Sequence, residues 1–393
     1  ICFMKIGIDI STLMDAYFSG VSEYSYNLIK KIIEKDKKNE YILYFNSFAP
    51  KNFKINFFKY PDVKVIQTRY PNKIFNHIMQ NLFKFPKVDK FLGKVDLFFS
   101  PHLNFYNYTN APKKIITIHD LSFVKYPEFF SLRKNLWHKM INIKKIPQKY
   151  DKIIAVSHNT KNDLIELFNI PENKIQVIYS GIENDMRKIS EQELNLIRDN
   201  YDFKQKYNLP NKFILYLGTI EPRKNIENTI KAFEVFLEKN PKETDYKLVI
   251  AGGSGWKNKN IFKTWKNSAQ KNNIKFIGYI DKNDKKYLYN LASLFIFSSY
   301  YEGFGFPPLE ALACGCPVIT ANNSSLSEII GDYSTLINPY DISSIAKAIE
   351  LHCFNKINNN IFLEKFANIK EEYSWDKCAK KYLDFFEDIN KYN

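Results

Sequence analysis

The chain has 393 residues, which is too long for one ordinary hydrophobic core, so its length predicts two domains. Hydrophobic residues make up 45% of the chain and aromatic residues 16%, which excludes a disordered protein. The net charge of +15 is uneven, because residues 1–180 carry 28 Lys and Arg against 15 Asp and Glu, while residues 181–393 carry a net charge of only +2. This asymmetry indicates an anionic partner for the first half, such as nucleic acid, phospholipid or a phosphorylated acceptor, with a solvated lysine surface as the alternative.

Cysteine usage and hydropathy bear on the compartment. The five cysteines show no regular spacing, which predicts reduced thiols and a cytoplasmic protein rather than a disulfide framework. No run approaches eighteen apolar residues, so we expect no transmembrane helix and no signal peptide, and any membrane contact to be peripheral.

Apolar runs alternate with amphipathic helical stretches, which is typical of α/β domains with parallel sheets. In the first half, strands are expected over residues 4–11, 41–45, 63–67, 95–101, 113–120, 152–157 and 174–181. A helix is expected over residues 22–35, after a loop that contains Gly20.

The second half repeats this pattern after a polar, weakly patterned stretch over residues 183–211. Its expected elements are strands over residues 212–219, 246–253, 274–280 and 294–300, a helix over 226–239, and a long amphipathic helix over 373–392. The pattern therefore predicts two doubly wound domains. Ligands of such sheets bind beyond the carboxyl ends of the strands, so two domains of this kind can share one cleft.

The stretch YEGFGFPPLEALACG places Glu302 on a loop and Glu310 in the first turn of a helix that begins with two prolines. The glycines between the two acids leave backbone amides beside the positive end of that helix, which suits a phosphate group. The alternative is that Glu310 only complements the helix dipole and that Glu302 is solvated.

The stretch LGTIEPRKN places Arg223 and Lys224 near the start of another helix. Cations oppose the helix dipole there, and an anion bound between them explains the arrangement better than two surface cations do. His119 and Asp120 follow the strand over residues 113–120, where a ligand contact competes with a purely structural role for the histidine. The stretch AGGSGW (251–256) is only a weak dinucleotide signal.

Taken together, these motifs resemble retaining glycosyltransferases of family 4, in the branch of mannosyltransferase B. The resemblance is carried by the acidic pair Glu302 and Glu310, which are separated by seven residues, by GTIEPRKN and by the runs over residues 117–130, 156–182 and 302–329. It implies the GT-B architecture, in which two Rossmann-like domains face each other across a cleft. The expected domains cover residues 1–185 on the acceptor side and 186–372 on the nucleotide-sugar side, and the helix over 373–393 packs back on the first.

The resemblance also implies roles for the phosphate-binding residues. Arg223 and Lys224 would neutralise the donor diphosphate and stabilise the leaving group. The amides of Gly303, Phe304 and Gly305 would complete that site. No metal ion and no cofactor would then be required, since protein groups supply the positive charge.

Other residues would bind the remaining parts of the donor. Glu302 would hold hydroxyls of the sugar, Glu310 would bind the ribose, and the backbone of Tyr279 and Ile280 would meet the base. From the first domain, His119 would touch the sugar with Asp120 beside it, and Gly20 would let its loop approach the donor. Thr219 departs from the family, because many members carry Arg there.

We therefore expect a retaining hexosyltransferase of bacterial surface polysaccharide synthesis, with mannose from GDP-mannose as the favoured donor sugar and a UDP- or dTDP-sugar as the alternative. Its acceptor would be a glycan or a lipid-diphosphate-linked sugar. A glycoside hydrolase and a non-catalytic nucleotide-sugar-binding subunit are the rival classes, and no nucleic acid partner is expected. The basic segment over residues 133–152 is expected to lie as a helix against the anionic inner face of the cytoplasmic membrane, with an ordinary basic helix as the alternative.

Overall fold

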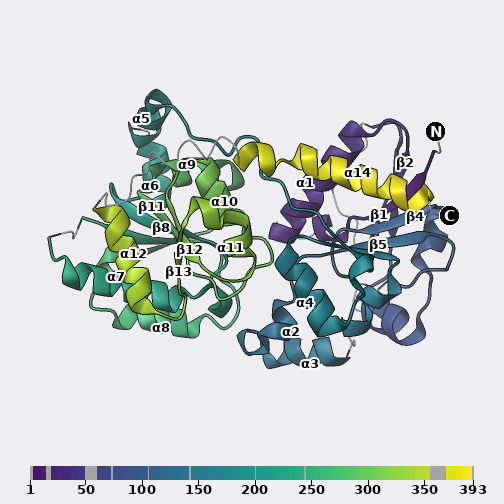
Figure 1. Cartoon of the computed structure of the whole chain (residues 1–393), viewed down its shortest axis with the longest axis horizontal. Helices are drawn as coiled ribbons and strands as arrows, with labels where there is room; N and C mark the ends of the chain where they lie inside the picture. Colours follow the sequence, from purple (N-terminus) through teal and green to yellow (C-terminus); the bar gives the residue numbers. More distant parts are fainter. Residues whose placement is uncertain are drawn as a thin grey trace. The chain divides into compact units, whose positions relative to one another are not determined.

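The computed structural model describes residues 3–14, 19–48, 60–71, 74–104, 106–140, 143–199, 201–242, 245–354 and 369–391. It divides the chain into two compact units (Figure 1). Unit 1 consists of Ile1–Leu121, Leu136–Gly181 and Tyr373–Asn393, and unit 2 of Ser122–Asn135 and Ile182–Glu372. Compared with the expected domain of residues 1–185, the main difference is that the segment Ser122–Asn135 packs with unit 2.

Unit 1 contains a seven-stranded parallel sheet with the order β3-β2-β1-β4-β5-β6-β7. Its strands are β1 (Lys5–Asp9), β2 (Glu40–Asn46), β3 (Val63–Thr68), β4 (Leu97–Ser100), β5 (Lys113–Ile118), β6 (Lys152–Ala155) and β7 (Ile175–Val177). Its main helices are α1 (Gly20–Lys35), the π-helix Ile74–Phe83, α4 (His158–Phe168) and α14 (Trp375–Lys391). The strands are almost continuously apolar because helices cover parallel sheets on both faces.

Unit 2 contains a six-stranded parallel sheet with the order β10-β9-β8-β11-β12-β13. Its strands are β8 (Phe213–Leu217), β9 (Lys247–Ala251), β10 (Ile274–Gly278), β11 (Leu294–Phe297), β12 (Val318–Ala321) and β13 (Thr335–Ile337). Its helices are α2 (Ser122–Lys125), α5 (Glu191–Asp199), α6 (Tyr201–Tyr207), α7 (Ile226–Lys239), α8 (Lys259–Asn267), α9 (Lys285–Leu291), α10 (Phe306–Ala313), α11 (Ser324–Ile330) and α12 (Ile342–Cys353), and α3 (Leu132–Met140) begins in unit 2 and ends in unit 1. The predicted doubly wound α/β fold is confirmed.

Each sheet reverses its winding direction at one place. In unit 1 the strand order runs outward from β1 on one side and from β4 on the other, and in unit 2 from β8 and β11. In open α/β sheets, ligands bind at this switch point, beyond the carboxyl ends of the two strands. The residues that follow β1, β4, β8 and β11 are therefore the first place to look for chemistry.

The last helix of the chain, α14, belongs to unit 1 and packs against α1 (Figure 1, yellow and purple). The carboxylate of Asp376 forms ion pairs with Lys31 and Lys35, with nitrogen–oxygen distances of 3.3 and 2.9 Å. The hydroxyl groups of Tyr24 and Tyr382 are hydrogen-bonded to each other. Gly181 lies against the beginning of this helix, since a Cβ atom there would be 2.2 Å from the backbone nitrogen of Trp375.

Two local predictions were wrong. The segment over residues 133–152 is not one helix, because α3 ends at Met140 and short 3-10 turns at Ile143–Lys145 and Pro147–Lys149 follow it. Ile146, which was expected to face a membrane, is 4% exposed. Residues 141–142 and the side chains of residues 137–140 lie outside the described part of this segment.

The polar stretch over residues 183–211 contains two helices, α5 and α6, for which the weakly patterned sequence gave no prediction. Among the described helices, none is both long enough and apolar enough to cross a membrane.

Candidate active site

Two basic side chains follow β8 in unit 2, on the short turn Pro222–Lys224 that precedes α7. Both pair with Glu302, which follows β11. Lys224 Nζ lies 2.5 Å from Glu302 Oε1, and Arg223 Nη1 lies 3.0 Å from Glu302 Oε2. The structure thus brings together three residues that the sequence singled out separately, at the switch point of the sheet.

Burial and charge set the protonation of this cluster. Burial by itself would raise the pKa of Glu302, but the charges of Arg223 and Lys224 outweigh it and lower that pKa to about 2. For Lys224, burial is the main cause and the charge of Arg223 the next, and together they lower the pKa of its ammonium group despite Glu302. The carboxyl of Glu302 is therefore ionised at neutral pH and acts as a hydrogen-bond acceptor rather than as an acid.

A fourth member of this cluster, Glu221, escaped the sequence interpretation. Its Oε1 accepts hydrogen bonds from Arg223 Nε at 3.1 Å and Nη2 at 2.8 Å, and Glu221 is 1% exposed. The guanidinium also donates to the carbonyl oxygen of Tyr301 at 2.6 Å. The signal was present in the same motif, because the acid stands two positions before the arginine in LGTIEPRKN.

Glu310, the second acid of the pair, is held by different partners. The hydroxyl of Tyr289 donates to its Oε2 at 2.8 Å, and Lys285 Nζ lies 3.8 Å from its Oε1. The predicted place in the first helical turn was wrong, because α10 begins at Phe306 and Glu310 is its fifth residue. The two prolines do stand at the helix start, as expected.

The glycine turn between the acids is tightly packed. Gly305 is the N-cap of α10 with φ of 100°, and a Cβ atom there would lie 2.8 Å from Leu326 Cδ2. Gly303, Phe304 and Gly305 are all buried. The turn therefore requires glycine at position 305 for both conformation and space.

The loops after β8, β9 and β10 are joined to one another. Gly252, with φ of 136°, donates from its backbone nitrogen to the Gly278 carbonyl at 2.7 Å, and a Cβ atom on it would lie 2.0 Å from the Gly218 carbonyl oxygen. The glycine at position 252 in the AGGSGW stretch thus allows close backbone packing among the loops at the carboxyl ends of these strands. Tyr279 follows β10 and is 57% exposed, while Ile280 is 4% exposed.

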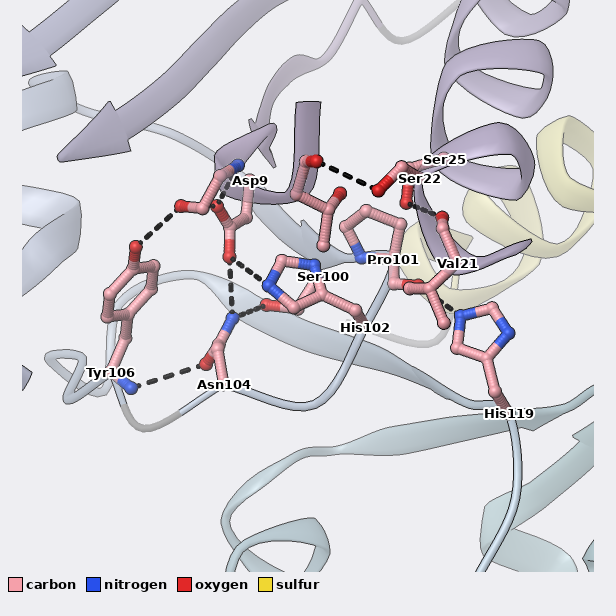
Figure 2. A network of polar contacts seen from close by, with 12 residues as sticks. Asp9, Val21, Ser22, Ser25, Ser100, Pro101, His102, Asn104, Tyr106 and His119 are labelled. Carbon is pink, nitrogen blue, oxygen red and sulfur yellow. Dashed lines mark hydrogen bonds and ion pairs between the residues drawn. The ribbon is translucent and has the colours of Figure 1, made fainter. Parts of the chain in front are cut away.

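His119 follows β5 in unit 1, as expected, and is held at the same edge as the ends of β1 and β4. Its Nε2 lies 2.8 Å from the carbonyl oxygen of Pro101 (Figure 2). Its ring meets that of Tyr24 edge-on. Burial lowers the pKa of His119 to about 4, so its ring is neutral near pH 7. Because a carbonyl only accepts, the ring proton is on Nε2, and Nδ1 is an acceptor. Asp120 comes next and is half-buried.

Asp9, at the end of β1, is a second residue that the sequence interpretation missed. It is fully buried and accepts hydrogen bonds from Ser11 Oγ at 2.6 Å and Asn104 Nδ2 at 2.9 Å, and it lies 3.4 Å from His102 Nε2 (Figure 2). Asn104 also donates to Ser100 Oγ at the end of β4. An acid inside the apolar run KIGIDIS was the available signal, since a buried carboxylate requires polar partners.

Gly20 is not in a loop, as was predicted, but is the first residue of α1. Ser19 caps this helix by accepting from the Ser22 backbone nitrogen, and the Ser22 hydroxyl donates to the carbonyl oxygen of Thr12 (Figure 2). Residues 15–18, which precede the cap, lie outside the described part. In the described ranges, no group of three or more His, Cys, Asp or Glu side chains is arranged to hold a metal ion.

Comparisons with known proteins agree with this arrangement of two units. Glycosyltransferase Family 4 matches residues 18–185, and Glycosyl transferases group 1 matches residues 197–368. O-antigen chain mannosyltransferase B of Escherichia coli is 29% identical over 292 residues, which cover 72% of each chain. The serotype-specific mannosyltransferase WbdA of Escherichia coli is 30% identical over 246 residues, which cover 61% of this chain but only 29% of WbdA.

Solved structures show the same fold. Sucrose-phosphate synthase from Thermosynechococcus elongatus has a TM-score of 0.74 at 18% identity and covers 99% of this chain and 100% of its own. HepE of Anabaena, in complex with UDP and glucose, has a TM-score of 0.71 at 18% identity and covers 98% and 100%. The chain therefore belongs to the GT-B glycosyltransferases, with a family 4 module in its first half and a group 1 module in its second.

Proposed function

We propose that this glycosyltransferase moves a hexose from a nucleotide sugar to a glycan or lipid-linked acceptor in the synthesis of a bacterial surface polysaccharide. The observation that carries the proposal is the buried cluster of Arg223, Lys224 and Glu302 at the switch point of unit 2. It offers two cations for a diphosphate and an ionised acceptor for sugar hydroxyls. Mannose from GDP-mannose is the favoured donor sugar because both Escherichia coli relatives are mannosyltransferases.

A UDP-sugar is the second candidate donor. It is favoured by the structural likeness to HepE, which was solved with UDP and glucose. The sequence identity to that protein is 18%, so the likeness supports a shared fold and leaves the choice of base to experiment.

The charges of the site suggest how the reaction proceeds. As the anomeric carbon–oxygen bond breaks, negative charge grows on the departing phosphate oxygen, and the cations of Lys224 and Arg223 stabilise it. The acceptor hydroxyl oxygen bonds to the anomeric carbon on the same face, and its proton passes to the departing phosphate oxygen. The configuration is then retained, and Glu302 positions the sugar. Protein cations supply the charge that a divalent metal supplies elsewhere, so EDTA should leave the rate unchanged.

The acceptor is assigned to unit 1. At the polar edge of unit 1, the half-buried His102 and His119 offer imidazole groups suited to sugar hydroxyls, while the fully buried Asp9 lies 3.4 Å from His102 Nε2. Because the pKa of His119 is lowered, its ring is neutral and its Nδ1 atom can accept a hydrogen bond.

A basic and aromatic patch on unit 1 supports peripheral binding at the inner face of the cytoplasmic membrane. Phe83 and Phe85 are 69% and 62% exposed, and Lys84 is exposed between them. Burial is the main cause that lowers the pKa of the Lys149 ammonium group, and the nearby charges of Lys84 and Lys87 lower this pKa further. Aromatic side chains beside clustered lysines suit an anionic lipid surface.

Liposome co-sedimentation tests this membrane contact. Binding should rise with the content of anionic lipid and fall with salt, and replacing Phe83 and Phe85 by serine should weaken it. Phe48→Ser is the matched control, because Phe48 is an exposed phenylalanine (67%) of the same unit outside the patch. Binding that ignores lipid charge would contradict the contact.

A thermal-shift panel of GDP-mannose, UDP-glucose, dTDP-glucose and ADP-glucose tests the function. A ligand that binds the native state raises the melting temperature, and we expect GDP-mannose to give the largest rise. A larger rise with UDP-glucose would select the second donor. No shift with any nucleotide sugar, together with sugar release from glycosides, would favour a hydrolase instead.

A further inference from the structure

We infer that the Glu302 carboxylate occupies the diphosphate-binding cations while unit 2 is unliganded, and that the diphosphate displaces it, which frees Glu302 to bind the donor sugar. This rests on the proposed function, since it concerns the order of events at the same site. Glu302 then has two roles. Its carboxylate competes with the donor diphosphate for the two cations, and it binds the donor sugar once it is displaced.

The geometry supports this competition. The two carboxylate oxygens are divided between the two cations, Oε1 accepting from Lys224 at 2.5 Å and Oε2 from Arg223 at 3.0 Å. Charge-assisted hydrogen bonds of this length are among the strong ones in proteins. A diphosphate that bonds to the same two cations has to replace these contacts.

The charge balance supports it as well. Glu221 and Glu302 together cancel the charges of Arg223 and Lys224, and all four side chains are at most 13% exposed. A neutral cluster attracts an anion weakly. Once Glu302 turns away, one positive charge becomes uncompensated, and the incoming diphosphate meets it in a buried setting where charges interact strongly.

The two cations differ in how firmly they are held. Arg223 donates from both Nε and Nη2 to Glu221, so it keeps a counter-ion when Glu302 leaves. Lys224 pairs, among the described residues, with the one carboxylate of Glu302. Lys224 is therefore the cation that exchanges partners, from carboxylate to diphosphate, while Glu221 keeps the Arg223 guanidinium in place.

A competing carboxylate at position 302 makes the effect of removing its charge differ from that of an ordinary donor-binding residue. Removing the charge of a residue that only binds the donor weakens donor binding. Removing the charge of a competing carboxylate strengthens the binding of any diphosphate, although the sugar contact and the transfer reaction are lost. Inorganic pyrophosphate isolates the first effect, because it has neither base nor sugar.

Isothermal titration of the full chain with inorganic pyrophosphate, and then with GDP and UDP, tests the inference. Glu302→Gln should bind pyrophosphate about tenfold more tightly than the wild type, because one nearby negative charge is removed. Glu193→Gln is the matched control, since it removes the same charge from the exposed Arg187 ion pair of unit 2 and should leave the affinity unchanged. Equal or weaker binding by a folded Glu302→Gln variant overturns the inference.

A second variant keeps the test decisive if the glutamine variant does not fold. Glu302→Asp retains the charge but is one methylene shorter and reaches the two cations less well, so its pyrophosphate affinity should lie between those of the wild type and Glu302→Gln. An affinity no higher than that of the wild type contradicts the competition. If the wild type binds GDP or UDP and transfers sugar while neither variant binds pyrophosphate more tightly, only this inference fails. If the wild type binds no nucleotide and transfers nothing, the proposed function fails.

Discussion

Arg223 and Lys224 carry the same formal charge but have different surroundings. Arg223 is fixed by Glu221, by the carbonyl of Tyr301 and by Glu302, whereas Lys224 Nζ bonds to Glu302 and lies 5.0 Å from the ring of Phe297. A lysine of this kind carries its charge on a flexible stem and rearranges readily. In the proposed diphosphate site, Lys224 is therefore the residue that changes partners, and Arg223 is its fixed support.

Replacing Lys224 by alanine should weaken the binding of GDP or UDP by about 10- to 100-fold, because a charge-assisted hydrogen bond to the diphosphate is lost. Titration calorimetry measures this effect. Lys239→Ala, which removes an exposed lysine at the last residue of α7 in the same unit, is the control and should bind like the wild type. An unchanged affinity in Lys224→Ala would exclude the lysine from the diphosphate site.

His119 should make the stability of the protein depend on pH. Its pKa in the folded protein, about 4, lies below the ordinary value of 6.5, so the unfolded chain takes up its proton first as the pH falls. The free energy of unfolding should therefore decrease between pH 6.5 and pH 4, by about 3 kcal/mol from this group.

Urea unfolding at several pH values compares the wild type with His119→Gln, which has no proton to gain. The difference between the two proteins should change over this pH window and be constant above it. His352, whose pKa burial also lowers to about 4, titrates in both proteins and cancels. A difference that is independent of pH would show that His119 is not buried as a neutral ring.

The sequence predicted some of these residues better than others. His119, Arg223, Lys224 and Glu302 were found because polar residues directly after buried strands stand out along the chain. The pairing of Lys224 with Glu302 joins residues 78 positions apart, so it depends on the neighbouring places of β8 and β11 in the sheet, which no local pattern contains. The role of Asp9 was missed for the same reason, since its partner Asn104 is 95 positions away.

The segment Ser122–Asn135 follows β5 in the chain but belongs to unit 2. The rings of Phe129 and Phe130 stack on those of Tyr300 and Trp256, and the Trp256 indole nitrogen donates to the Phe129 carbonyl oxygen at 2.8 Å. Tyr300 and Tyr301 directly precede Glu302 in the chain, so the segment packs beside the loop that carries the acid. The AGGSGW stretch thus ends in an anchoring tryptophan.

Trp256→Ala should loosen this segment, because it removes the stacking on Phe130, the contact of the Lys134 ammonium group with the indole ring and the hydrogen bond to Phe129. Hydrogen exchange followed by mass spectrometry should show faster exchange over residues 122–135 in the variant. Trp265→Ala is the matched control, since Trp265 packs on Phe276 in α8 and β10 of the same unit and should leave that exchange unchanged. Equal exchange in both variants would mean that other contacts hold the segment.

Strands were easier to predict than the connections between them. The strands of unit 1 and the first four of unit 2 agree with their apolar runs to within a few residues, because both faces of a parallel sheet are covered. Strands β12 and β13 were not predicted. The segment over 133–152 was wrongly extended into one helix, although Pro147 is a poor helix-interior residue.

The two units have the same doubly wound architecture but different polar groups at their switch points. Each has a doubly wound sheet with buried polar groups at its switch point, carboxylate and imidazole in unit 1 and paired ions in unit 2. The net charge of +13 over residues 1–180 matches the proposed contact of unit 1 with anionic lipid, and the near-neutral second half matches a site whose ions pair with each other. The family assignment rests on matches that span most of the chain, whereas the choice of donor and acceptor depends on individual side chains.

The most direct measurement follows the release of nucleoside diphosphate from GDP-mannose and UDP-glucose, with a mannosyl-lipid acceptor present, for the wild type and for Glu302→Ala. The wild type should release the diphosphate only when acceptor is present and form an equal amount of glycosylated product. The variant should lose at least about 100-fold in rate, as expected when a group that positions the sugar is removed, without weaker binding of free diphosphate. Equal turnover by the variant, or release of free sugar without an acceptor, would contradict the account.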